Sequence, residues 1–222
     1  MRVASIVCPG PSLDTCIIPD LHEQSEMVVA VNRGYRAWQD YPNLYPHMIF
    51  AVDGPHAWKA HETDEIKNLS RSLVITRGED QIPQKWRERI DCHRRVIAVS
   101  VSKSSFKDKD PFHGELLKRP LKGTLIAWQH LVRLGFDRIA IAGCDCRTGS
   151  TIRYYFDSVP TDPDDRRRTA QINSKAAESY DTVYETLKNW QPYAQARGVR
   201  TANISGEGSR LHEFLPSISA GG

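Results

Sequence analysis

The sequence predicts an α/β protein with a Rossmann-like, mostly parallel sheet of about seven strands and helices on both faces. Short runs of β-branched residues recur along the chain, and segments with helical periodicity lie between them, which is typical of parallel strands joined by crossover helices. Clusters of Gly and polar residues also follow the predicted strands directly, where open α/β sheets bind their ligands. With 222 residues the chain is expected to form one such domain, 1–222.

Seven segments are expected to be strands because they are short and rich in Val and Ile. They are Val3–Val7, Met27–Asn32, Met48–Val52, Leu73–Thr76, Val96–Val101, Arg138–Ala142 and Val199–Ile204. The clearest helix is expected over Thr124–Leu134, where apolar residues share one stripe and Gly135 follows as a stop signal. Further helices are expected at Arg33–Asp40, His56–Asn68, Pro83–Cys92 and Ser174–Ala196.

The segment 147–169 is expected to be a lid-like excursion from the sheet rather than a second domain. It is rich in Asp, Arg, Pro and Tyr and lacks the apolar residues that a core of its own would need. Polar segments of this kind often order over a bound ligand, so its arginines could close over phosphates.

Composition excludes several classes of protein. The 30 Lys and Arg residues against 27 Asp and Glu leave a net charge of +3, which is too small for extensive nucleic-acid binding but tolerates an anionic substrate. No apolar run approaches the ~18 residues of a membrane span. The apolar run at the N-terminus is too short for a signal peptide. The five scattered cysteines lack paired CxxC motifs and are expected to be free thiols. A cytoplasmic protein is therefore expected, with an oligomer possible.

The first candidate site is the loop Gly10-Pro11-Ser12, which follows the first predicted strand. Such a loop lets backbone N–H groups approach a phosphate. It is neither a dinucleotide fingerprint nor a Walker motif. The alternative is a tight turn in which Ser12 caps the next helix.

Two further strand ends carry polar side chains. Asn32 ends the second predicted strand and offers an amide that can read a ribose or a base edge, whereas Asp53 follows the third and could hold a hydroxyl or a divalent cation. Each of them alone fits a helix cap or turn residue better than a ligand contact, and it is the three polar strand ends together that indicate a site.

The third candidate site is Lys122-Gly123-Thr124 at the start of the clearest helix, together with Asp145 after the strand Arg138–Ala142. A glycine and a hydroxyl at a helix N-terminus favour an anion, and Lys122 adds a positive charge. The alternative is plain capping, with Thr124 as the N-cap.

These residues resemble the superfamily of the glycosyltransferase family 42 bacterial sialyltransferases and the 6-hydroxymethylpterin diphosphokinase-like proteins. The resemblance rests on the segments Cys8–Leu13, Val31-Asn32, Gly123-Thr124, Leu134–Ile139 and Gly143–Asp145. Tyr154–Asp157, Asn173–Lys175 and Ser209–Leu211 are similar in order and spacing. The pattern is more specific for the superfamily than for a substrate.

The resemblance implies a nucleotide or nucleotide-sugar donor at the strand ends and an acceptor that the sequence does not identify. It places Tyr154 beside the donor phosphate, and it places Arg147 where the sialyltransferases have a phosphate-contacting tyrosine. Asn173 stands where they carry their general-base histidine, and an amide cannot accept a proton near neutral pH. Pro9 also removes one backbone donor from the first loop.

His113 is a candidate substitute base because it precedes Lys122 closely in the sequence. Three functions remain open on the sequence. The first is a glycosyltransferase-like enzyme without a metal, and the second is a diphosphokinase-like enzyme in which Asp53 and Asp145 carry Mg²⁺. The third is a nucleotide-binding module that has lost its base.

Overall fold

The computed structural model describes residues 1–52, 71–76, 96–98, 101–105, 109–114, 117–119, 122–146, 163–205 and 208–217. The helices expected at His56–Asn68 and Pro83–Cys92 lie outside these ranges. No helix in the described ranges is long and apolar enough to cross a membrane.

The main sheet has seven strands in the order β5-β4-β3-β2-β1-β8-β9, and every neighbouring pair is parallel. The strands are β1 (Val3–Val7), β2 (Met27–Val31), β3 (Met48–Phe50), β4 (Leu73–Thr76), β5 (Val96–Ala98), β8 (Arg138–Ala142) and β9 (Arg200–Asn203). The Rossmann-like, mostly parallel α/β fold expected from the sequence is confirmed. Three strands have the predicted bounds, and the others are within three residues of them.

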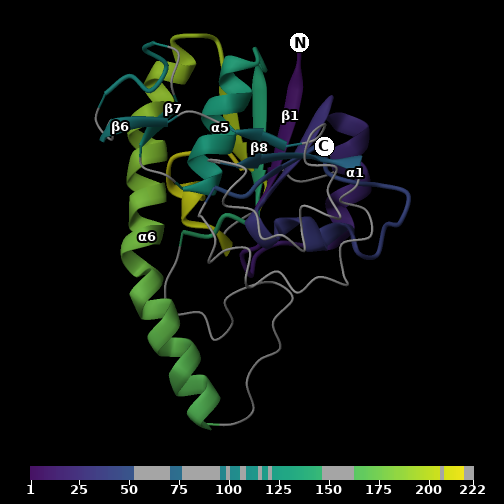
Figure 1. The fold of residues 1–222 in the computed structure, drawn as a ribbon, viewed down its shortest axis with the longest axis vertical. Helices are drawn as coiled ribbons and strands as arrows, with labels where there is room; N and C mark the ends of the chain where they lie inside the picture. Colours follow the sequence, from purple (N-terminus) through teal and green to yellow (C-terminus); the bar gives the residue numbers. More distant parts are fainter. Residues whose placement is uncertain are drawn as a thin grey trace.

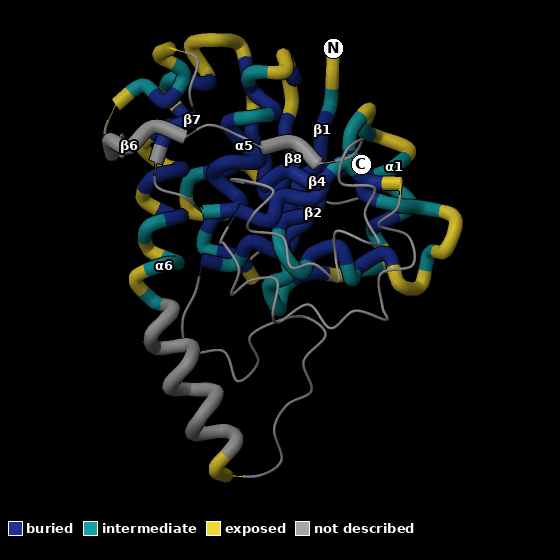
Figure 2. The backbone as a smooth tube through the Cα atoms, viewed as in Figure 1, coloured by how far each residue is buried: buried dark blue, intermediate teal, exposed yellow. Residues whose placement is uncertain are grey.

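Helices cover both faces of the sheet. Successive residues of a strand point to opposite faces, so each strand contributes side chains to both cores. In β2, Val29 and Val31 pack in the core beneath α5 (Gly123–Arg133) and α6 (Pro163–Gln195), whereas Val28 and Ala30 pack in the core beneath α1 (Ile18–Gln24). Figure 1 shows α6 and α1 on opposite sides of the strands, and Figure 2 shows the strands running through the buried interior.

The strand order changes direction at β1. The chain first adds β2, β3, β4 and β5 on one side of β1 and later adds β8 and β9 on the other. The loops that leave β1 and β8 therefore follow adjacent strands at the place where the strand order reverses, and open α/β sheets bind their ligands at such a point. We call the end of the sheet where the parallel strands finish its carboxyl edge.

Four features differ from the sequence prediction. The helix α1 was missed, and so was a second, two-stranded sheet of β6 (Val101–Ser105) and β7 (Leu117–Arg119). The segment Asn32–Trp38 is a 3₁₀ helix, η2. Finally, α6 begins at Pro163, so residues 163–169 of the expected lid are helical, and its N-terminal half extends beyond the carboxyl edge (Figure 1).

Candidate functional site

The loops after β1 and β8 pack backbone against backbone at the carboxyl edge. Gly10 N donates to Gly143 O at 2.8 Å, and Cys8 N donates to Ala142 O at 2.8 Å. A Cβ atom at Gly10 would overlap the Gly143 carbonyl, and Gly143 itself has a φ of +64°. Only glycine allows this approach and this backbone conformation without strain.

Ser12 and Asp145 join the same two loops through side-chain hydrogen bonds. Asp145 Oδ2 accepts from Ser12 N at 3.0 Å, and Asp145 Oδ1 accepts from the Ser12 hydroxyl. Ser12 does not cap the following helix; Asp14 does so by accepting from Cys16 N. Leu13 N donates to Gly10 O at 3.0 Å, which closes a tight turn with Pro11 in its second position, where a fixed φ is favourable.

Asn32 and the start of α5 lie beside this junction. Asn32 has a φ of +48°, a conformation that non-glycine residues adopt rarely outside turns and functional sites. A Cβ on Gly123 would lie 3.5 Å from Asn32 Nδ2. The N-cap of α5 is Lys122 and not Thr124, and it makes no side-chain capping bond. The first turn of α5 and the Asn32 amide therefore lie side by side.

Three buried thiols pack under the site. Thr124 Oγ1 lies 3.3 Å from Cys8 Sγ and 3.9 Å from Cys144 Sγ, and Cys144 Sγ lies 3.7 Å from Cys146 Sγ. Hydrogen bonds from Cys146 and Cys8 lower the pKa of Cys144, whereas bonding to Cys144 and burial raise the pKa of Cys8 and Cys146. All three are free cysteines, in agreement with the sequence prediction.

A third loop, which leaves β9, also reaches the carboxyl edge; its Ser209–Leu211 segment is part of the resemblance but was not predicted to lie at the site. We call Ser205 and Gly208–Leu211 the strap. The strap donates to the β8 loop at two carbonyls, from the Ser209 hydroxyl to Cys144 O at 2.5 Å and from Arg210 N to Asp145 O at 2.8 Å. Ser205 Oγ accepts from Gly143 N at 2.6 Å.

The strap also meets the β1 loop. A Cβ on Gly208 would lie 2.7 Å from Ser12 Cβ. The available sequence signal was the run Ser205-Gly206-Glu207-Gly208-Ser209 directly after a strand, which has the same Gly and Ser character as the other two loops.

The predicted nucleotide-binding residues in the described ranges lie together at the carboxyl edge. They are Gly10, Pro11, Ser12, Asn32, Lys122, Gly123, Thr124 and Asp145. Four other predicted site residues are not placed. Asp53, Arg147 and Tyr154 lie outside the described residues, and position 173 lies in α6, where the side chain of Asn173 is not described.

His113 lies at the opposite end of the sheet, which corrects the expectation that it approaches the site. The loop that carries it is held by Arg133, in the last turn of α5, which donates to Gly114 O at 2.8 Å and to Pro111 O at 3.1 Å. The first turn of α5 is at the carboxyl edge, and its eleven residues cover about 16 Å. His113 is therefore too far from Asn32 and Ser12 to exchange a proton with a ligand there.

A metal site is not formed by the described side chains. Within the described ranges no three His, Cys, Asp or Glu side chains are grouped so that they could hold a metal ion. Both carboxylate oxygens of Asp145 accept hydrogen bonds from Ser12, so this residue holds a loop in place.

Three solved structures share this fold. The sialyltransferase CstII from Campylobacter jejuni in complex with CMP-3FNeuAc is 14% identical with a TM-score of 0.52, over 99% of this chain and 87% of the other. A variant of sialyltransferase Cst-II in complex with CMP gives 11% identity, a TM-score of 0.50 and the same two coverages. The MAf glycosyltransferase from Magnetospirillum magneticum AMB-1 gives 11% identity and a TM-score of 0.58, with 99% of this chain on 34% of the other.

No protein-family model and no curated protein sequence matches the chain. At these identities the structural likeness establishes the architecture, so the chain has a glycosyltransferase-like, Rossmann-like α/β fold.

Proposed function

We propose that the protein is a glycosyltransferase-like enzyme that binds the nucleotide of a nucleotide-sugar donor at the carboxyl edge. The observation that carries this proposal is the meeting of the β1 loop, the β8 loop and the strap at the point where the strand order changes direction. Neighbours of the same fold, crystallised with CMP or a CMP-sugar analogue, support a nucleotide as the ligand.

The chemistry of the assembled residues suits an anionic nucleotide. The start of α5 offers backbone N–H groups and the positive end of the helix dipole, and Lys122 adds a formal charge there. The Asn32 amide has one acceptor and two donor positions, which can read a ribose or a base edge. The close packing of Gly10 against Gly143 keeps the backbone of the β1 and β8 loops together at the carboxyl edge.

The resemblance of the sequence assigns the departing phosphate to Arg147 and Tyr154. A guanidinium can bind a phosphate through two hydrogen bonds, and preorganised donors stabilise the charge that develops as the sugar leaves. The proposed reaction breaks the bond between the sugar and the phosphate oxygen and forms a bond from the sugar to an acceptor oxygen. The acceptor proton then requires a base other than Asn173.

A second candidate is a nucleotide-binding module without turnover. Two observations favour it. Asn173 occupies the position of the expected base, and His113, the substitute base that the sequence indicated, lies at the other end of the sheet. Both candidates share the same nucleotide site, so turnover separates them.

Calorimetric titration with CMP, UDP and ATP, with and without Mg²⁺, tests the site. Release of sugar from a panel of CMP-sugars and UDP-sugars, followed by chromatography, tests turnover. Binding with metal-independent sugar release supports the enzyme, and binding without release supports the module. Mg²⁺-dependent release of AMP from ATP would instead indicate a diphosphokinase-like enzyme. His113→Ala is the matched control, since it should leave binding unchanged, and failure of every nucleotide to bind would refute the proposal.

A further inference from the structure

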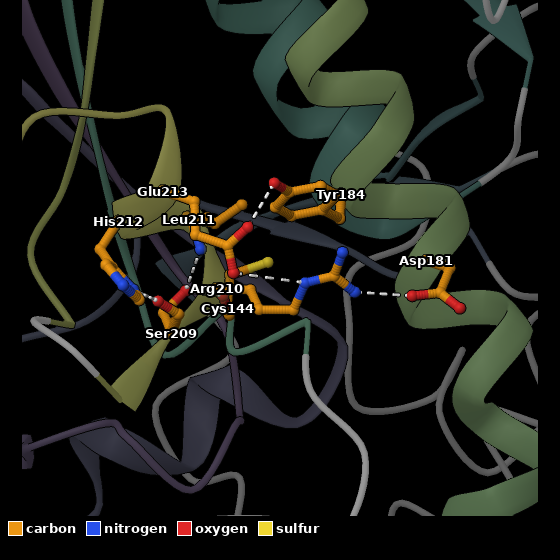
Figure 3. Close-up of polar contacts among 8 residues, drawn as sticks. All are labelled: Cys144, Asp181, Tyr184, Ser209, Arg210, Leu211, His212 and Glu213. Atoms are coloured by element: carbon orange, nitrogen blue, oxygen red, sulfur yellow. Dashed lines mark hydrogen bonds and ion pairs between the residues drawn. The ribbon is translucent and has the colours of Figure 1, made fainter.

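Arg210 contacts two separate parts of the molecule. Its backbone N donates to Asp145 O at 2.8 Å, at the carboxyl edge. Its side chain points the other way, toward α6, where Nη1 forms an ion pair with Asp181 Oδ1 at 2.7 Å (Figure 3). This residue therefore links the strap to the helix.

The Arg210 side chain contacts Tyr184 and Glu213, which also contact each other. The guanidinium carbon lies 3.8 Å from the centre of the Tyr184 ring, and Nε lies 3.8 Å from Glu213 Oε1. The Tyr184 hydroxyl donates to Glu213 Oε2 at 2.7 Å, and Tyr184 is only 4% exposed. A planar guanidinium can stack flat on a ring while its separate N–H groups bind two carboxylates, and the compact ammonium of lysine does not reproduce this geometry.

The strap in turn determines where the β8 loop lies. Three consecutive residues of that loop, Gly143, Cys144 and Asp145, are hydrogen-bonded to Ser205, Ser209 and Arg210 respectively. Ser209 is fully buried, and its hydroxyl also accepts from Leu211 N at 3.1 Å. Because Asp145 accepts a hydrogen bond from Ser12, a shift of the strap should also displace the β1 loop.

The contribution of Arg210 to global stability should be small. Its side chain is 30% exposed and that of Asp181 is 62% exposed, and ion pairs of this kind contribute little to folding. Arg197 has the same chemistry at the other end of the sheet, with Nη2 2.9 Å from Asp110 Oδ2 and its guanidinium carbon 4.9 Å from the centre of the Phe112 ring. The position of Arg210 between α6 and the strap therefore distinguishes it.

We propose that Arg210 is a positioning residue that ties the strap, and through it the Asp145–Ser12 contact, to α6. This tie fixes the nucleotide site relative to the helix that carries Asn173, eleven residues before Tyr184. The part of the proposal that concerns the ligand rests on the proposed function, whereas the mechanical tie does not.

The first experiment measures CMP binding by calorimetry in the full chain for Arg210→Ala, Arg210→Lys and the matched control Arg197→Ala. Arg210→Ala should weaken binding by roughly threefold to thirtyfold, the range for substitutions that act through other residues. Arg210→Lys should recover only part of this affinity, because it replaces one contact of several. All three proteins should melt close to the wild type, and equal affinity in Arg210→Ala and wild type would overturn the proposal.

The second experiment keeps the tie testable if CMP does not bind. Amide hydrogen exchange without ligand should be faster in residues 143–146 and 208–211 of Arg210→Ala and unchanged there in Arg197→Ala. Faster exchange in a protein that binds no nucleotide would refute the proposed function and support the tie. Unchanged exchange in Arg210→Ala, or an equal increase in Arg197→Ala, would overturn the tie itself.

Discussion

The contact between Ser12 and Asp145 is the sharpest test of the site, because it joins residues 133 positions apart. Replacing Asp145 by Ala removes the acceptor of two hydrogen bonds, from Ser12 N and from the Ser12 hydroxyl. Bonds to a charged group contribute about 1.5–3 kcal/mol each at most, and both residues are half-buried, so we expect a loss of about 2–3 kcal/mol. Ser12→Ala removes one of the two bonds and should cost about 1 kcal/mol.

The assay is a double-mutant cycle on the free energy of unfolding, measured by urea titration and by the melting temperature. The two substitutions share one bond, so the double variant should lose about 1 kcal/mol less than the sum of the single variants. In a protein of this length Asp145→Ala should lower the melting temperature by about 4–12 °C.

The control replaces a carboxylate at the other end of the sheet. Asp137 Oδ2 accepts from Arg2 N at 2.6 Å, far from Ser12, so Asp137→Ala and Ser12→Ala should be additive. A coupling between Ser12 and Asp145 below about 0.3 kcal/mol, the usual limit of additivity, would refute the contact between the two loops.

Three further outcomes are expected. Asn32→Ala should weaken nucleotide binding by about 1–3 kcal/mol without unfolding the protein, and an unchanged dissociation constant by calorimetry would leave Asn32 a purely conformational residue. Exposed Cys16 should react with a thiol reagent before the three buried thiols, which should react only on unfolding; equal rates by mass spectrometry would contradict their burial. Burial and the nearby His47 lower the pKa of His22, so the folded state favours the neutral imidazole. The contribution of His22 to the free energy of unfolding is therefore full above a pH of about 6.5, the value of the unfolded chain. It is lost as the pH falls through the lower pKa of the folded state. His22→Gln should therefore lose less stability than the wild type between pH values of about 7.5 and 5.5 in urea titrations.

The central strands were predictable because a strand buried on both faces is a run of apolar, β-branched residues. Val3–Val7, Leu73–Thr76 and Arg138–Ala142 have the bounds that the sequence indicated. The strand Val101–Ser105 was missed because polar residues predominate in it.

His113 shows where reasoning from proximity in the sequence fails. It precedes Lys122 by nine residues, and an extended segment of that length can span about 30 Å. This exceeds the length of α5, so the chain can place His113 at one end of the helix and Lys122 at the other. The contacts of Arg133 decide that it does so.

The amino-acid pattern indicates that polar and glycine residues end the strands, and it makes Gly10, Ser12, Asn32, Gly123 and Asp145 candidates for one site. Local periodicity carries this information, because strands and their ends are properties of neighbouring residues. It does not say which strands are adjacent.

The folded chain shows what the pattern leaves open, that β1 lies between β2 and β8, and this order brings Asp145 onto Ser12 and the strap onto both loops. It also placed Cys8 against Cys144 and Arg210 against Tyr184. Contacts of this kind depend on strand order and on close packing between distant segments, and the pattern of residues along the chain does not specify them.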